Sequence, residues 1–183
     1  MFKYEYLNVS WIENCRKYLQ DIFHDIEGKF IVDYAFGRGN WSLAFIEAGA
    51  KKVYSIDASK DNCNRLEFYC ASNNIKNIEI IHGNLVNEVM HFDADIVWVY
   101  GVLHHISELD VFLKNLRHVM SENAYAYFYY YNKHSLRHVI VDICRDLYVF
   151  LDEKEFDRCS WLFPRTIKNR ASDDLVAPYI GWK

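Results

Sequence analysis

The sequence predicts an α/β fold in which a doubly wound, mainly parallel sheet of five strands, in the order 3-2-1-4-5, carries helices on both faces. Five short apolar runs alternate with stretches that have apolar residues at helical spacing. The chain has 183 residues, which is enough for one domain with a substantial core. Because 51% of the residues are hydrophobic and 17% aromatic, a disordered chain is excluded.

The net charge and the cysteines argue against a nucleic-acid partner and against a metal site. A net charge of −4 gives no basic footprint, so a nucleic-acid partner is not expected. Five cysteines form neither a C-x-x-C pair nor a metal-like spacing with histidine, which favours reduced thiols and no metal. No apolar run approaches 18 residues and the amino terminus has no signal-like apolar region. A cytoplasmic protein without a membrane partner is therefore expected.

The first predicted element is a helix between Ser10 and Gly28. Ser10 begins it with a capping box, because Glu13 follows three residues later, and Gly28 ends it. One apolar stripe at helical spacing contains Trp11, Cys15, Tyr18, Leu19, Ile22, Phe23 and Ile26. Residues 1–27 are therefore expected to form a helical cap that packs on one face of the sheet.

Residues 30–59 predict a strand, a glycine-containing loop, a helix and a second strand. Gly37 and Gly39 let the backbone turn tightly and let a ligand lie close to it, because glycine has no Cβ. Asn40 is expected to cap the helix, and Gly49 to end it in the left-handed conformation. This stretch is a βαβ unit suited to a nucleoside.

An acidic residue ends each of these two strands. Asp57 stands where such units place a carboxylate that accepts hydrogen bonds from both ribose hydroxyls. Asp33 would repel a pyrophosphate but would attract a cationic ligand. Ser42 stands where a dinucleotide fingerprint has its third glycine, which disfavours a nicotinamide-dependent oxidoreductase. The charges therefore favour a cationic nucleoside.

The segment D-Y-A-F-G-R-G, which begins at Asp33, resembles motif I of the class I S-adenosylmethionine-dependent methyltransferases, D-x-G-x-G-x-G. Ala35 replaces the first glycine of that motif. The resemblance implies a Rossmann-like methyltransferase fold with S-adenosylmethionine as cofactor and S-adenosylhomocysteine as product. The last two strands of the usual seven are not found, so the sheet edge would be exposed unless the C-terminal segment or a second subunit covers it.

The third predicted strand, residues 78–81, follows a helix capped by Ser59 and leads to Asn84. In the family an aspartate at this corner accepts a hydrogen bond from the adenine amino group, and the Asn84 carbonyl oxygen can accept the same bond. The backbone N–H of Leu85 can meet a ring nitrogen. By resemblance, Asp33 would orient the methionine amino group and Asp57 would hold the ribose. The implied cofactor site consists of Asp33, Ala35, Gly37, Gly39, Asp57, Ala58, Asn84, Leu85, Tyr100 and Gly101.

The fourth predicted strand, residues 95–100, is followed by Leu103-His104-His105. This segment resembles the L-H-H segment of many small-molecule methyltransferases and not the N/D-P-P-Y/F segment of nucleobase enzymes, which favours a small-molecule acceptor. His104 or His105 is a candidate general base, since imidazole titrates near neutral pH. The alternative is that both histidines only cap the next helix and pack near the sulfonium.

A helix is expected from a Ser107 cap to Met120, followed by a turn at Asn123. The fifth strand, residues 124–131, would place its odd-numbered tyrosines on one face. Tyr130 and Tyr131 at its carboxyl end are candidates for an acceptor pocket, stacking on an aromatic acceptor or facing a cationic amine. Packing in the core explains them equally well.

Three segments are predicted: an N-terminal cap (1–27), a cofactor-binding domain (28–151) and a C-terminal segment (152–183) that can be incomplete. The predicted function is methyl transfer from S-adenosylmethionine to an O, N or C acceptor, on a small molecule. The alternative is a non-catalytic methyltransferase-like subunit or fragment, which the changes at Ala35 and Asn84 and the missing strands motivate.

Overall fold

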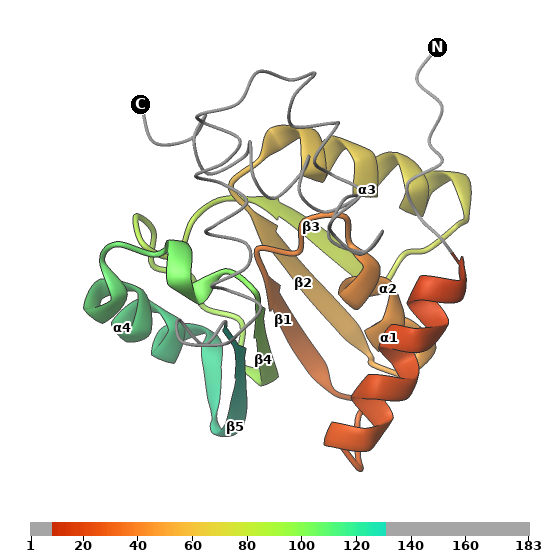
Figure 1. Ribbon diagram of the computed structural model, residues 1–183, viewed down its shortest axis with the longest axis horizontal. Coiled ribbons are helices and arrows are strands. Elements are labelled where there is room, and N and C mark those ends of the chain that lie inside the picture. Colours follow the sequence, from red (N-terminus) through yellow and green to blue (C-terminus); the bar gives the residue numbers. More distant parts are fainter. Residues whose placement is uncertain (1–8, 131–183) are drawn as a thin grey trace, which may run out of the picture. The chain divides into compact units, whose positions relative to one another are not determined.

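The computed structural model describes residues 9–130, which form a five-stranded parallel sheet flanked by helices (Figure 1). The sheet order is β3-β2-β1-β4-β5, so the predicted order is confirmed. The elements in chain order are α1 (Val9–Ile22), β1 (Phe30–Tyr34), α2 (Asn40–Glu47), β2 (Lys52–Asp57), α3 (Lys60–Ser72), β3 (Ile78–His82), β4 (Ala94–Tyr100), the 3-10 turn η1 (Leu103–His105), α4 (Leu109–Val119) and β5 (Met120–Tyr129).

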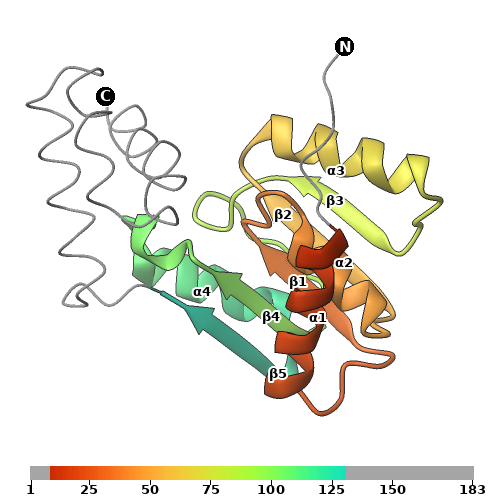
Figure 2. The ribbon, with the colours of Figure 1, turned by 45° about the vertical axis from the view of Figure 1, so that its right-hand side comes forward.

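Two hydrophobic clusters, one on each face of the sheet, bury the strands, as the alternation of side chains along a strand requires. The first joins residues of α1, α2 and α3 to the sheet, with the fully buried Trp98 of β4 among its members. The second joins α4 and the loop after β3 to the opposite face, around the buried Phe112. The layering can be followed in Figure 2. The prediction of helices on both faces is thus confirmed.

The order in which successive strands are added reverses at β1, which pairs in parallel with β2 on one side and with β4 on the other. Asp33 in β1 lies opposite Ser55 of β2 and Trp98 of β4. In open sheets of this kind, ligands bind beyond the carboxyl ends of the strands at this switch point. The carboxyl ends of β1, β2 and β4 therefore define where a site is expected.

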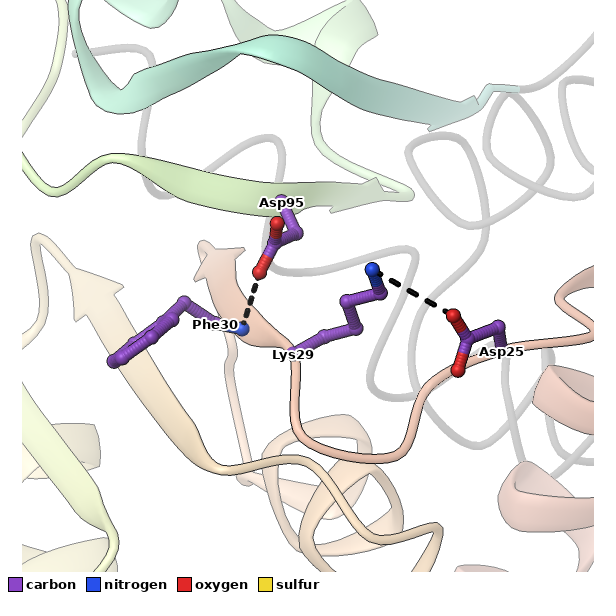
Figure 3. Close-up of polar contacts among 4 residues, drawn as sticks. All are labelled: Asp25, Lys29, Phe30 and Asp95. Carbon is purple, nitrogen blue, oxygen red and sulfur yellow. Dashed lines mark hydrogen bonds and ion pairs between the residues drawn. The ribbon is translucent and has the colours of Figure 1, made fainter.

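The opposite end of the sheet is held by contacts of its own (Figure 3). The Asp95 carboxylate of β4 accepts a hydrogen bond of 2.8 Å from the backbone N–H of Phe30, where β1 begins. Lys29 also forms an ion pair of 3.6 Å with the exposed Asp25. Exposed pairs contribute little stability, so the bond to Phe30 is the more important of the two for strand register.

An aromatic layer attaches α1 to the sheet. The Tyr18 hydroxyl of α1 and the Tyr127 hydroxyl of β5 lie 2.9 Å apart. Tyr18 also packs edge-on against Trp98 and tilted against Trp41 of α2. Aromatic pairs of this geometry stabilise a contact beyond the area that they bury. These contacts place α1 on the same face as α2.

The first helix differs from its prediction. It begins at Val9 and ends at Ile22, six residues before Gly28, which instead lies in a turn with φ of +75°. Trp11 was predicted to face the core but is 47% exposed, whereas Ile12 is buried. The buried face of α1 is the one that contains Cys15 and Leu19. Ile12 precedes these residues by three and seven positions and therefore lies closer to the middle of this face than Trp11 does. The assignment of residues 1–27 to a separate cap segment stays a prediction.

The region around α4 also differs. Glu108, and not Ser107, is the N-cap residue of α4, and its side chain makes no capping hydrogen bond. The predicted turn at Asn123 is wrong, because β5 starts at Met120 directly after α4. The pairing of β5 with β4 is irregular here: Ala94 pairs with Met120, whereas Ile96 pairs with Tyr125. Tyr131, the rest of the predicted cofactor-binding domain to residue 151 and the question of further strands lie outside the described residues.

Along β5 the tyrosines share one face as predicted: Tyr127 packs on the first cluster, whereas Ala126 and Phe128 pack on the second. Among residues 9–130, no helix has the length and apolar character needed to cross a membrane.

Candidate functional site

The loop from β1 to α2 has a left-handed backbone at three alternate positions. The φ angles are +57° at Ala35, +58° at Gly37 and +80° at Gly39. Two glycines adopt this conformation without strain, whereas alanine does not. Gly39 is the N-cap of α2, so the prediction of a cap by Asn40 is wrong. Asn40 is the first helical residue, and its buried Oδ1 has no hydrogen-bond partner among residues 9–130. Gly49, with φ of +94°, follows the end of α2 as predicted.

Replacing Ala35 with glycine is expected to raise the free energy of unfolding by about 0.5–1 kcal/mol, because relief of the left-handed strain exceeds the entropy that glycine adds to the unfolded chain. Chemical denaturation of the two proteins measures this difference. Ala71→Gly is the matched control: Ala71 lies exposed in α3, and glycine there should lower stability by about 1 kcal/mol. A destabilised Ala35→Gly protein would contradict the strain at this position.

The space around the glycines differs in a way that matters for a ligand. A Cβ on Gly37, or on Gly101 at the end of β4, would meet no atom of the described part of the chain within 4 Å, apart from its neighbours in sequence. A Cβ on Gly39 would instead lie 2.6 Å from Cδ1 of Leu66 in α3. Gly37 and Gly101 therefore leave room beside the backbone for a ligand, whereas Gly39 serves close packing between the loop and α3.

The variants Gly37→Ala and Gly39→Ala are expected to differ in stability. Both place alanine at a left-handed position, which costs about 1 kcal/mol, but only the second adds a steric overlap with Leu66, for a total of about 2–4 kcal/mol. Denaturation curves of the two variants provide the measurement. Equal losses would show that Leu66 moves aside freely.

Asp57 fixes the loop to the end of β2. Its Oδ2 accepts a hydrogen bond of 2.9 Å from the Gly37 N–H. Its Oδ1 accepts hydrogen bonds from the Ser59 N–H at 2.8 Å and from Asn62 Nδ2 at 3.2 Å. Ser59 also caps α3 through its hydroxyl, as predicted. The carboxylate that was predicted for a ribose thus also orders the glycine loop, which the sequence did not indicate.

Asp33 lies under the amino end of α2 and is only 1% exposed. Its Oδ2 accepts a hydrogen bond of 2.6 Å from the Ser42 hydroxyl, which in turn accepts one of 2.7 Å from the Ser55 hydroxyl. Burial raises the pKa of Asp33 to about 7; the hydrogen bonds from Ser42 oppose this rise and the charge of Asp57 adds to it. The sequence pattern marks Ser42 only as the place of a missing glycine and does not indicate its contact with Asp33.

Asn84 follows β3, and its Oδ1 accepts two hydrogen bonds, from the Tyr34 hydroxyl at 2.8 Å and from the Val86 N–H at 2.9 Å. Tyr34, the last residue of β1, was not predicted as a site residue. Burial raises the pKa of its hydroxyl to about 12, although a hydrogen bond from the Leu85 backbone opposes the rise. Tyr34 therefore connects β1 to the corner predicted for adenine.

The carboxyl end of β4 is lined by aromatic rings. Tyr100 stacks on Tyr129 of β5 with ring centroids 4.2 Å apart and lies 4.7 Å from Trp41 of α2. The Gly101 N–H donates a hydrogen bond of 2.8 Å to the Tyr129 carbonyl. These contacts bring the end of β4 beside α2, which begins at the glycine loop. Trp41 was not predicted for this place.

The remaining predicted residues lie nearer the surface. His104 and His105 are exposed in η1, and their rings are 4.1 Å apart. Ala58 is exposed, and its carbonyl contacts His82 Nε2 at 3.0 Å. Tyr130 is 62% exposed, and Tyr131 lies outside the described residues. The structure thus joins Asp57 to Gly37 by a direct hydrogen bond.

Residues 31–123 match the family described as methyltransferase domain. A curated relative, probable protein arginine N-methyltransferase 6 of Arabidopsis thaliana, is 32% identical over 72 residues, which are 39% of this chain and 17% of that protein. The chain therefore spans less than a fifth of the length of that relative.

Solved structures show the same fold. A SAM-dependent methyltransferase from Aquifex aeolicus has a TM-score of 0.57 at 26% identity, over 65% of each chain. Coclaurine N-methyltransferase bound to N-methylheliamine and SAH has a TM-score of 0.57 at 16% identity, over 68% of this chain and 38% of that chain. Phosphoethanolamine N-methyltransferase 1 of Haemonchus contortus, solved with phosphoethanolamine and S-adenosylhomocysteine, has a TM-score of 0.54 at 21% identity, over 64% and 25%.

The family match covers half of the chain and includes the loop with Asp33, Gly37 and Gly39 as well as Asp57. The observed sheet order and the switch point between β1 and β4 agree with it. The chain therefore belongs to the class I S-adenosylmethionine-dependent methyltransferase domain family.

Proposed function

We propose that this chain binds S-adenosylmethionine at the carboxyl edge of its sheet and transfers the methyl group to an O, N or C atom of a small molecule. The observation that carries the proposal is the bond between the Asp57 carboxylate and the Gly37 N–H, because it places a ribose-type acceptor beside a loop with open space. When bound, the cofactor supplies a methyl group on a sulfonium, a leaving group that its positive charge already activates.

The residues of the chain bind and orient in this proposal. Asp57 accepts a ribose hydroxyl at Oδ2, which receives one hydrogen bond from the Gly37 N–H and has a second lone pair, with Ala58 next to it, and Asp33 lies near the methionine ammonium. The open backbone at Gly37 and Gly101 lets the ligand lie close to the loop. Orientation of two reactants can contribute about 7–11 kcal/mol to a rate, so binding residues alone account for a large effect.

The acceptor side is built from the aromatic end of the sheet. Tyr100 and Tyr129 present stacked rings there, and Tyr130 follows. Aromatic faces suit a planar or cationic acceptor. His104 and His105 serve as a base only for an acceptor that must lose a proton. A small molecule is favoured because two of the solved neighbours were determined with N-methylheliamine and phosphoethanolamine, respectively.

Calorimetric titration of the full chain with S-adenosylmethionine, S-adenosylhomocysteine and NAD tests the proposal. Micromolar binding of the first two without binding of NAD is the expected result. A chain that binds neither would favour the alternative, a methyltransferase-like subunit without catalysis. Acceptors are then screened for transfer of a radiolabelled methyl group, with small amines, phenols and an arginine-containing peptide as separate arms, since the curated relative is a probable protein arginine methyltransferase.

A further inference from the structure

The oxygen and the nitrogen of the Asn84 side-chain amide differ in their hydrogen bonding. Its oxygen accepts two hydrogen bonds, from the Val86 N–H and from the Tyr34 hydroxyl, and a carbonyl oxygen has two lone pairs. The Val86 N–H can only donate, so the atom that faces it must be the oxygen. The orientation of the amide is therefore fixed, and its acceptor capacity is used.

Tyr34 is held in place by packing as well as by this bond. It is 6% exposed, and its ring lies 5.0 Å from that of Phe112 in α4. The side chain reaches from the end of β1 past the end of β2 to the corner after β3, where Asn84 lies. Moving the hydroxyl away from Asn84 would leave a buried donor without its partner, which is unfavourable.

What Asn84 can still offer to a ligand is its Nδ2 group. Within residues 9–130, no atom accepts a hydrogen bond from this group, and the residue is half-buried. Asn84 also lies close to the proposed ribose position: His82 pairs with Asp57 across the strands, and the Gly83 N–H donates to the Asp57 carbonyl at 3.1 Å. A base attached to a ribose at Asp57 would therefore meet a donor at Asn84.

We propose that Asn84 determines base specificity by donating a hydrogen bond from Nδ2 to the ring nitrogen N1 of adenine, and that Tyr34 is the positioning residue that imposes this polarity. The inference rests on the proposed binding of S-adenosylmethionine. It reverses the expectation from the sequence, in which the Asn84 oxygen accepts a bond from the adenine amino group. Tight binding then requires a hydrogen-bond acceptor at position 1 of the ligand's base and does not require the amino group at C6.

Four ligands distinguish the two polarities in calorimetric titrations of the full chain. They are S-adenosylhomocysteine, its analogue with hydrogen in place of the 6-amino group, its 1-deaza analogue and, as control, its 7-deaza analogue. The 6-hydrogen and 7-deaza analogues are expected to bind within about threefold of S-adenosylhomocysteine, and the 1-deaza analogue about tenfold more weakly. A tenfold loss with the 6-hydrogen analogue would overturn the proposal.

Variants assign the effect to the two side chains. Asn84→Asp replaces the donor by an acceptor, so the penalty of the 1-deaza analogue should vanish and a several-fold penalty of the 6-hydrogen analogue should appear. A 1-deaza penalty that persists in this variant would mean that another group contacts N1, and would overturn the assignment. The wild-type series decides the polarity even if this variant fails to fold.

Tyr34→Phe frees one lone pair of the Asn84 oxygen, so the amino group gains a partner and the 6-hydrogen analogue should bind several-fold more weakly than S-adenosylhomocysteine. Tyr54→Phe removes a hydroxyl from the neighbouring strand β2 and should leave the order of the ligands unchanged. A purely structural role of Tyr34 would weaken all four ligands equally. If the wild-type chain binds none of the four, the proposed function itself fails; if all four bind equally, only this inference fails.

Discussion

Replacement of Asp57 by alanine is expected to weaken the binding of S-adenosylhomocysteine by about 1.5–3 kcal/mol, which is roughly 10- to 150-fold. The proposed bonds from ribose to a charged acceptor are lost, and so is the bond that holds Gly37. Stability should also fall by about 2–4 kcal/mol, because the Ser59 N–H and Asn62 Nδ2 lose their acceptor. Calorimetric titration measures the first effect and chemical denaturation the second.

Two further variants separate the causes. Asp57→Asn retains one carbonyl acceptor, so it should keep more of the stability than alanine does while still losing much of the affinity. Asp61→Ala removes a carboxylate from the first turn of α3, four residues away, and should leave the affinity unchanged. An unchanged affinity of the Asp57→Ala chain would remove the ribose assignment and leave Asp57 as a structural residue of the loop.

The order of the sheet and the places of the two aspartates could be predicted because they depend on local patterns. Apolar runs of strand length mark β1 and β2, and an acidic residue stands near the end of each run. Parallel strands bring their carboxyl ends to one edge, so Asp33 and Asp57 had to lie near each other. These are consequences of periodicity and topology, which a single sequence contains.

The helix caps could not be predicted as reliably. Asn40 is a good capping residue by type, but the left-handed Gly39 takes the N-cap position. The Asp33 side chain, from β1, then accepts hydrogen bonds from the hydroxyl and the backbone N–H of Ser42 in the first turn of α2. Asp33 of β1 thus accepts a hydrogen bond from a backbone N–H at the start of α2, and the sequence around the helix end does not indicate such a partner.

The same reason explains why Tyr34, Trp41 and Ser42 were missed as site residues. The sequence pattern assigns no role to Tyr34 or Trp41 and marks Ser42 only as the place of a missing glycine, whereas each acquires its role from a partner elsewhere in the sequence. The hydrogen bond from Tyr34 to Asn84 spans 50 residues. Only the alternation of Asp33 and Tyr34 on opposite faces of β1 was available beforehand, and it does not identify the partners.

Replacement of Asp33 by asparagine is expected to stabilise the chain at pH 8 by about 2–4 kcal/mol. The folded-state pKa of Asp33 is raised to about 7, mainly by burial, whereas an unfolded aspartate titrates near pH 4. Between these values the folded chain holds a proton that the unfolded chain has released, so stability falls as the pH rises through this window. Asparagine carries no such charge and can still accept the hydrogen bond from Ser42.

Denaturation at pH 4.5, 6 and 8 checks this expectation. The wild-type and Asp33→Asn chains should differ little at the lowest pH and most at the highest, whereas Asp61→Asn, exposed in α3, should follow the wild type throughout. Among residues 9–130, two titratable groups lie close enough to affect or be affected by the Asp33 charge. Asp57 of β2 raises the pKa of Asp33, and Cys15 of α1 stays neutral at these pH values because burial raises its own pKa to about 11. If the wild type and Asp33→Asn were equally stable at pH 8, ionisation of the buried Asp33 would not cost the expected free energy of unfolding.

Ionisation of Asp33 destabilises the fold, so stability does not explain a carboxylate at this position. Binding of the proposed ligand does. The ammonium of the methionine part favours ionised Asp33, so the affinity of the wild type for S-adenosylhomocysteine should rise between pH 6 and 8. Asp33→Asn should bind about tenfold or more weakly at pH 8 in spite of its higher stability. Methylthioadenosine lacks the ammonium and should bind both chains alike at every pH. Equal binding of S-adenosylhomocysteine by both chains at pH 8 would instead make Asp33 a purely structural partner of Ser42.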